Sequence, residues 1–244
     1  MRSICVSLIL LFGFLSAKAQ VQSMEVGDPS SVGGNYGTVR YHDPSTIGQK
    51  SAPLTYADIS GSPFWDENWK PAFLFLSAGT VIKLKNVRIN LYTNEIHYLD
   101  NNSKEWAAQT GIIQKIIFLN EKDTSKITSV FEFFADPVDN SKIVYYRVLN
   151  NGKFRLLELR RSYINTSPYD PLQGKTVSSF FFKSTYAVTD STLTKPLKGL
   201  NRNNILPFIY PDNNWEQWLN QSGNKLTAEK EVIAFLDHVN SKRK

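Results

Sequence analysis

The stretch KIVYYRVLNNGKFRLLELRRSYI, residues 142–164, holds two apolar runs on either side of Asn150-Asn151-Gly152. Tyr, Val, Ile, Leu and Phe are the residue types that strands favour. Asn-Gly tolerates the positive φ angles of a two-residue turn, so this stretch predicts an antiparallel β-hairpin. The hairpin indicates a β-sheet protein, and we read the rest of the chain outward from it.

Two further runs on the N-terminal side, residues 72–76 and 81–85, flank the small residues Ser77-Ala78-Gly79-Thr80 and predict strand, turn and strand. The alternation of apolar and polar residues changes phase at Asn86, which predicts a β-bulge there. Thr93-Asn94 then reverses the chain into another extended run.

Extended runs recur along the middle of the chain, with short turns between them. About eight or nine strands are expected, and a sheet of that size must curl or split into two layers. The prediction is therefore a mainly β fold over residues 61–195: an antiparallel meander forming a curled sheet, a half-barrel or a two-layer sandwich. The sequence leaves these three open.

The pattern becomes helical over residues 196–244. Short pieces are broken by Pro207 and Pro211, and the last segment, LTAEKEVIAFLDHVNSKRK, carries an apolar stripe. The residues of that stripe are Val232, Phe235, Leu236 and Val239. A C-terminal helical cap that packs on a face or an edge of the sheet is expected.

The first nineteen residues have the layout of a secretory signal peptide: Arg2, an apolar run, and Ala17-Lys18-Ala19 before Gln20. The apolar run has about a dozen residues, short of the roughly 20 that span a bilayer. We expect cleavage before Gln20, no transmembrane span in the mature chain, and a periplasmic or extracellular location. Residues 20–60, rich in Gly, Ser and Pro, are expected to form an irregular or flexible leader.

The net charge is +6, and loss of Arg2 and Lys18 leaves +4. So modest an excess suits anionic surfaces, and an exported protein is not expected to bind nucleic acid. The single cysteine, Cys5, lies in the expected signal peptide. The mature chain would therefore have no disulfide, thiolate nucleophile or cysteine-ligated zinc.

The motifs of common chemistries are missing from the sequence. His42, His97 and His238 lie far apart and form no HExxH pair, so no metal site is expected. There is no G-x-S-x-G elbow for a serine nucleophile, and GGNYG lacks the pattern of a phosphate-binding loop. We expect no catalytic residue and no cofactor.

The segment GSPFWDENWKP, which begins at Gly61, holds the one acid pair that suggests an enzyme. Asp66 or Glu67 could serve a glycan-directed hydrolase together with a distant acid. Adjacent residues on an extended chain point to opposite faces, so the two cannot converge on one bond. Candidates for a distant partner are Asp136, Glu158 and Asp170.

The same segment has a structural interpretation, in which Phe64, Trp65 and Trp69 seal the end of the sheet. In the binding interpretation, Trp65 and Trp69 contact a ligand instead. Tyr146, Arg155 and Arg160 are further binding candidates, because aromatic and basic residues interleave around them and suit an anionic glycan or a lipid headgroup.

Two segments carry a resemblance to a known group. They are GSPFWDENWKPAFLFLSAGTVIKLKNVRINLYTNEIHYLD and NNILPFIYPDNNWEQWLNQSGNKLTAEKEVIAFLDHVNS. They resemble an uncharacterised family of secreted or periplasmic proteins of Bacteroidota-type Gram-negative bacteria. Relatives of this kind often have a polar turn with Asp or Lys where this chain has Ser77-Ala78-Gly79-Thr80. The resemblance covers about a third of the chain; it implies an exported bacterial protein and transfers no active site.

The sequence thus favours an exported, non-enzymatic binding or scaffolding protein of the bacterial cell envelope, whose partner is a lipid, a glycan or another envelope protein. The alternatives are the glycan-directed hydrolase and a structural subunit of an envelope complex.

Overall fold

The computed structural model describes residues 59–108, 111–167, 177–190, 192–209 and 213–242. The expected signal peptide, the expected leader up to residue 58, and Asp170 lie outside the described residues.

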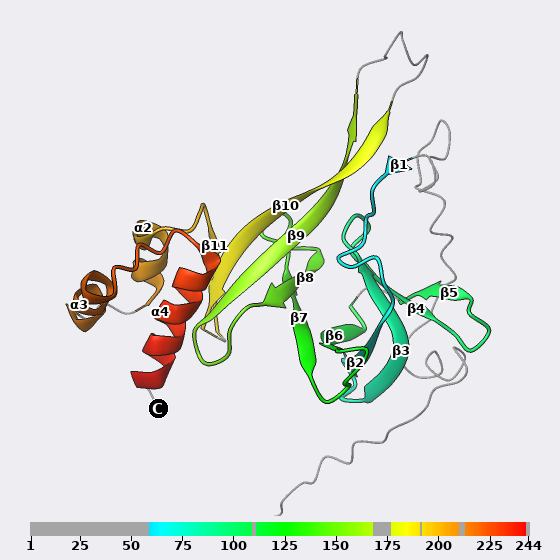
Figure 1. The fold of residues 1–244 in the computed structure, drawn as a ribbon, viewed down its shortest axis with the longest axis horizontal. Coiled ribbons are helices and arrows are strands. Elements are labelled where there is room, and N and C mark those ends of the chain that lie inside the picture. Colours follow the sequence, from blue (N-terminus) through cyan, green and yellow to red (C-terminus); the bar gives the residue numbers. More distant parts are fainter. Residues whose placement is uncertain (1–58, 109–110, 168–176, 191, 210–212, 243–244) are drawn as a thin grey trace, which may run out of the picture.

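Within the described ranges, eleven strands form one large curled sheet that does not close on itself, and the C-terminal part of the chain forms helices (Figure 1). The mainly β fold class is confirmed, as a single curled sheet. Its strands are β1 (Ile59–Ser60), β2 (Lys70–Leu76), β3 (Val81–Asn90), β4 (Glu95–Leu99), β5 (Glu105–Ala107), β6 (Ile113–Leu119), β7 (Ile127–Ala135), β8 (Ile143–Val148), β9 (Arg155–Thr166), β10 (Ser178–Thr189) and β11 (Thr194–Leu197).

The strand order is β1-β10-β9-β8-β7-β6-β2-β3-β4-β5, with β11 also on β10. Two antiparallel meanders, β2 to β5 and β6 to β10, are therefore joined where β2 pairs with β6. Strand β2 can take this central place because Ala72, Leu74 and Leu76 face the core while its backbone pairs on both sides. The short β1 pairs in parallel with β10, so the sheet begins at Ile59, before residue 61.

The predicted bulge is present in β3. Lys70 pairs with Val87 and Ala72 pairs with Leu84, so β3 holds one extra residue around Asn86. The predicted turn between β2 and β3 is present as well: Leu76 N donates to Thr80 O at 2.8 Å, with Gly79 at a φ of 83°.

The hairpin of β8 and β9 is confirmed, but the predicted two-residue turn is wrong. Leu149 N donates to Leu156 O, and the residues between them form a longer loop. Asn150 closes that loop, because its Oδ1 accepts from Leu156 N at 2.7 Å. The loop is long because Phe154, within it, is fully buried among the helices.

Two main cores lie at separate places in the sheet. The first, inside the curl, gathers apolar side chains of β2, β3, β4, β6, β7 and β8. The second, the helical core, joins Phe154, Leu156, Val188 and Leu197 to the C-terminal helices. Figure 1 shows those helices at one end of β9 and β10, away from the curl.

The helical segment comprises α2 (Arg202–Ile205), the short 3₁₀ helix η2 (Leu206–Phe208), α3 (Asn213–Ser222) and α4 (Glu229–Lys242). The predicted stripe of α4 is confirmed, since Val232, Phe235, Leu236 and Val239 are all fully buried. In the described part of the chain, no helix combines the length and the apolar content needed to cross a bilayer.

Candidate binding surface

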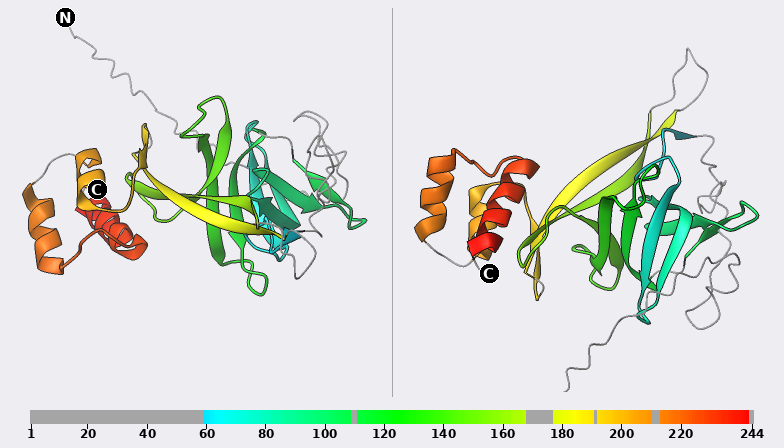
Figure 2. Two further views of the ribbon diagram at one scale, coloured as in Figure 1. Left: turned by 90° about the horizontal axis from the view of Figure 1, so that it is seen from above. Right: turned by 60° about the horizontal axis from the view of Figure 1, so that its bottom comes forward.

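Strands β9 and β10 continue past the point where β8 leaves them. They pair over their whole length, from Arg155↔Thr189 to Thr166↔Ser178. In contrast, β8 pairs with β9 only at Arg147↔Glu158 and Val148↔Leu157. We call residues 160–166 and 178–184 the distal arm, and Figures 1 and 2 show it extending away from the helical end of the molecule.

The distal arm carries every exposed aromatic side chain of the described residues. Tyr163 is 38% exposed, Phe181 46% and Phe182 37%. Tyr163 and Phe181 pair across the strands and stack with ring centroids 5.5 Å apart, while Phe182 lies on the opposite face. Both faces of the distal arm therefore expose aromatic rings to solvent, because no hydrophobic core covers these three side chains.

The charge of the distal arm has one sign. Arg160, Arg161 and Lys183 belong to it, and its sequence contains no acidic residue. Arg161 is neutralised from outside the arm by Asp136, which follows β7. Burial would raise the pKa of Asp136, but the hydrogen bonds from Arg161 and from the backbone N–H of Val138, together with the positive charge of Arg161, lower it.

The five residues predicted to bind do not come together. Trp65 packs on the first core, Trp69 lies 4.1 Å from the Arg88 guanidinium, and Tyr146 is buried. Arg155 forms an ion pair with Glu132 at 2.7 Å. Only Arg160 belongs to the distal arm, where its guanidinium lies 4.2 Å from the Phe182 ring centroid.

The segment GSPFWDENWKP packs on the sheet, and its expected role in sealing the end of the sheet stays a prediction. Phe64 is buried and forms an isolated bridge to Asn90. The Trp65 ring lies 5.4 Å from the ring of Phe118 and 5.1 Å from that of Phe131. The segment thus adds aromatic side chains to the first core.

Replacing Trp65 with alanine is expected to lower the free energy of unfolding by about 2 kcal/mol. This is below the value for a fully buried aromatic, because the indole is only partly buried. Chemical denaturation of the purified variant measures the effect. An unchanged unfolding midpoint would contradict the packing role.

The acids considered for hydrolysis are engaged in ion pairs or lie apart. Asp66 contacts Lys70 at 2.5 Å, and although burial would raise its pKa, hydrogen bonds from Lys70 and Asn68 lower it. Asp136 is bound to Arg161, and Glu158 contacts Arg147 at 2.7 Å.

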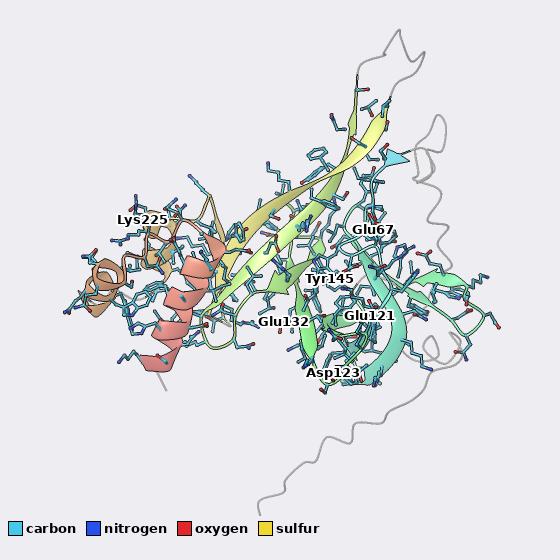
Figure 3. The ribbon with its side chains drawn as sticks, in the orientation of Figure 1. Glu67, Glu121, Asp123, Glu132, Tyr145 and Lys225 are labelled. Carbon is cyan, nitrogen blue, oxygen red and sulfur yellow. The ribbon has the colours of Figure 1, made fainter. Side chains whose placement is uncertain are left out.

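Glu67 is exposed, and Figure 3 shows it well away from Asp123. Across the described ranges, no cluster of three or more His, Cys, Asp or Glu side chains could hold a metal ion.

The exposed aromatics of the arm were missed by sequence reasoning. The signal was the run Phe180-Phe181-Phe182, in which aromatic residues occupy both faces of one strand. Phe180 is buried in a small cluster with Ile59, whereas its two successors are not.

Comparison of the chain with protein-family models, with curated proteins and with solved structures finds no match.

Proposed function

We propose that this protein is a non-enzymatic binding protein of the bacterial cell envelope that attaches to an anionic membrane surface through the distal arm. The observation that carries the proposal is the gathering of all exposed aromatic rings of the described residues on an arm with cations and no acid.

Aromatic rings favour the boundary between lipid headgroups and acyl chains. Tyr163, Phe181 and Phe182 are already partly desolvated by one another and by Arg160. Placing them in that boundary removes apolar surface from water, which favours association by roughly 25 cal/mol for each Å² removed.

The cations add an attraction that neutral lipids would not provide. A Lys or Arg close to an anionic bilayer contributes about 1 kcal/mol, and salt screens this contribution. Arg160 and Lys183 have no acidic partner among the described residues, so both are available to lipid phosphates.

Export is part of the same proposal. Its support is the signal-peptide layout of residues 1–19 and the resemblance to secreted proteins of Bacteroidota-type bacteria. An exported chain meets the anionic phospholipids of the envelope on its route.

Vesicle flotation tests the proposal. The protein is expected to float with vesicles containing phosphatidylglycerol, less so at high salt, and not with vesicles of phosphatidylcholine alone. The double variant Phe181→Ser, Phe182→Ser is expected to bind at least about tenfold more weakly, since about 1.4 kcal/mol of lost binding energy corresponds to a factor of ten.

The matched control is Ile127→Ser, which removes a 60% exposed apolar side chain from β7, outside the arm. It is expected to bind as the unchanged protein does. Binding of the double variant at full strength, or no binding of the unchanged protein to either vesicle, would refute the membrane role and favour a protein partner for the arm.

A further inference from the structure

A cleft opens where β8 and β9 separate, and we call it the fork cleft. Its volume is about 760 Å³. Four segments line it: the turn between β3 and β4, the turn between β7 and β8, the first two residues of β8, and residues 159–163 of β9. The cleft exists because β8 pairs with β9 at two positions only, beyond which the strands diverge.

The turn between β3 and β4 is held in the fork cleft by hydrogen bonds to β8 and to β9. Asn94, at a φ of 58°, donates from Nδ2 to Ile143 O at 2.7 Å and accepts at Oδ1 from Tyr145 N at 3.3 Å. On the other side, Ser162 N donates to Leu91 O at 3.1 Å. The walls of the cleft are therefore preformed.

Arg160 is the distinctive charge of the fork cleft. Among the arginines of the described residues, it is the one whose side chain forms neither an ion pair nor a hydrogen bond. The other cations of the cleft are compensated: Arg161 by Asp136, and Lys142 by Asp139 at 3.1 Å. The cleft thus has an excess of one positive charge, held half-buried against Phe182.

Two hydroxyl groups of the lining also have no hydrogen-bond partner among the described residues. They are Ser162 Oγ and Thr93 Oγ1, and both are shielded from solvent. Ser162 lies two residues from Arg160, so the two side chains share a face of β9. A shielded hydroxyl without a partner is unfavourable, and an acceptor at this place would satisfy it.

We propose that the fork cleft binds a small ligand through one oxyanion, a phosphate or a carboxylate. The planar guanidinium of Arg160 pairs with such a group in a two-point contact, and the hydroxyls of Ser162 and Thr93 donate to it. Tyr92, Ile143 and Leu159 line the cleft beside it and suit a compact, partly apolar body. The site shares Arg160 with the distal arm, but it does not require membrane attachment, since its ligand enters the cleft from solution.

Isothermal titration calorimetry at constant ionic strength tests this site, with inorganic phosphate, sn-glycerol 3-phosphate, acetate and a short-chain phosphatidylglycerol below its micelle concentration as probes. At least one probe is expected to bind. Binding of phosphate or glycerol phosphate assigns the oxyanion to a soluble phosphate, and binding of the lipid alone assigns it to a headgroup. Binding of acetate alone assigns it to a carboxylate. Each of these results supports the site.

Arg160→Gln is expected to weaken the binding probe at least about tenfold. Arg160→Lys keeps the positive charge but lacks the planar guanidinium. Its affinity is expected to lie between those of the unchanged protein and of Arg160→Gln, and it serves as the test variant if Arg160→Gln folds poorly. Lys85→Gln removes one positive charge from an exposed position of β3, outside both the fork cleft and the distal arm, and is expected to leave affinity unchanged.

Absence of binding by all four probes, or equal binding by the unchanged protein and both Arg160 variants, would overturn the assignment. These titrations contain no vesicles. A protein that fails to float with membranes can therefore still pass this test, and one that floats can fail it.

Discussion

Replacing Phe154 with alanine is expected to lower the free energy of unfolding by about 3 to 5 kcal/mol, the usual cost of removing a fully buried aromatic ring. Phe154 belongs to the loop between β8 and β9, yet its side chain is 0% exposed inside the helical core. Its ring centroid lies 6.2 Å from that of Phe208.

The backbone of the same residue is fixed from α4. Asn240 accepts at Oδ1 from Phe154 N at 2.9 Å and donates from Nδ2 to Phe154 O at 2.9 Å. Gly152 makes this approach possible, because a Cβ there would lie 2.5 Å from the Asn240 side chain. Phe154 thus joins the helices to the sheet through its ring and its backbone.

Phe181→Ala is the matched control, because it truncates the same residue type at an exposed position of β10. Its expected effect is within about 0.5 kcal/mol. Urea denaturation, followed by tryptophan fluorescence and by circular dichroism, measures both variants. Equal losses for the two would contradict the anchoring role of Phe154.

Glu105→Gln is expected to cost about 3 kcal/mol, because it removes the acid that holds two basic side chains on β3 and β4. Arg88 Nη2 donates to Glu105 Oε1 at 2.8 Å, and His97 Nδ1 lies 2.5 Å from the same oxygen. His97 is 0% exposed. The Arg88 guanidinium is held between two rings, 3.6 Å from the centroid of Phe64 and 4.1 Å from that of Trp69.

The pH dependence of this loss identifies its origin. Burial alone would lower the pKa of His97, but hydrogen bonds with Glu105 and Glu95 raise it above 6.5. Its contribution to stability is therefore complete below pH 6.5 and is lost as the pH rises through the higher folded-state value.

Burial alone would raise the pKa of Glu105, but His97 and Arg88 lower it below 4.5. That contribution is complete above pH 4.5 and is lost as the pH falls through the lower folded-state value. The contributions of His97 and Glu105 to stability are therefore both fully present between pH 4.5 and 6.5.

The loss of stability in Glu105→Gln should consequently be larger at about pH 5.5 than at about pH 8.5, measured by denaturation at both values. Glu132→Gln serves as the control, since Glu132 pairs with Arg155 and Lys115 and contacts no histidine. Its effect should be similar at the two pH values. A pH-independent loss in Glu105→Gln would show that His97 is not charged in the folded protein.

Much of the fold follows from local patterns. The phase change at Asn86 and the stripe of α4 are encoded by the spacing of neighbouring residues, and both were predicted. The pairing of β2 with β6 is not local: nothing in KPAFLFL tells which strand will lie on its second edge. The length of the β8–β9 loop also depends on a distant partner, because the helices bury Phe154.

The candidate surface was harder to predict for a related reason. Trp65 and Tyr146 have the residue types of binding sites, but whether such a ring is buried depends on what folds over it. Phe181 and Phe182 are exposed only because β9 and β10 continue beyond their neighbours, and that length is a property of the sheet. From the sequence, Arg155 and Arg160 are equally good candidates for binding an anion. The fold distinguishes them, because it places Glu132 in an ion pair with Arg155.

The central claim, that the distal arm meets the membrane, is tested most directly by an environment-sensitive fluorophore on a cysteine at position 181. The chain has one native cysteine, Cys5, so a Cys5→Ser background makes the label unique. On addition of phosphatidylglycerol vesicles, emission from position 181 is expected to shift to the blue, whereas the same label at position 127 keeps its emission. No shift at 181, or equal shifts at both positions, would contradict the account.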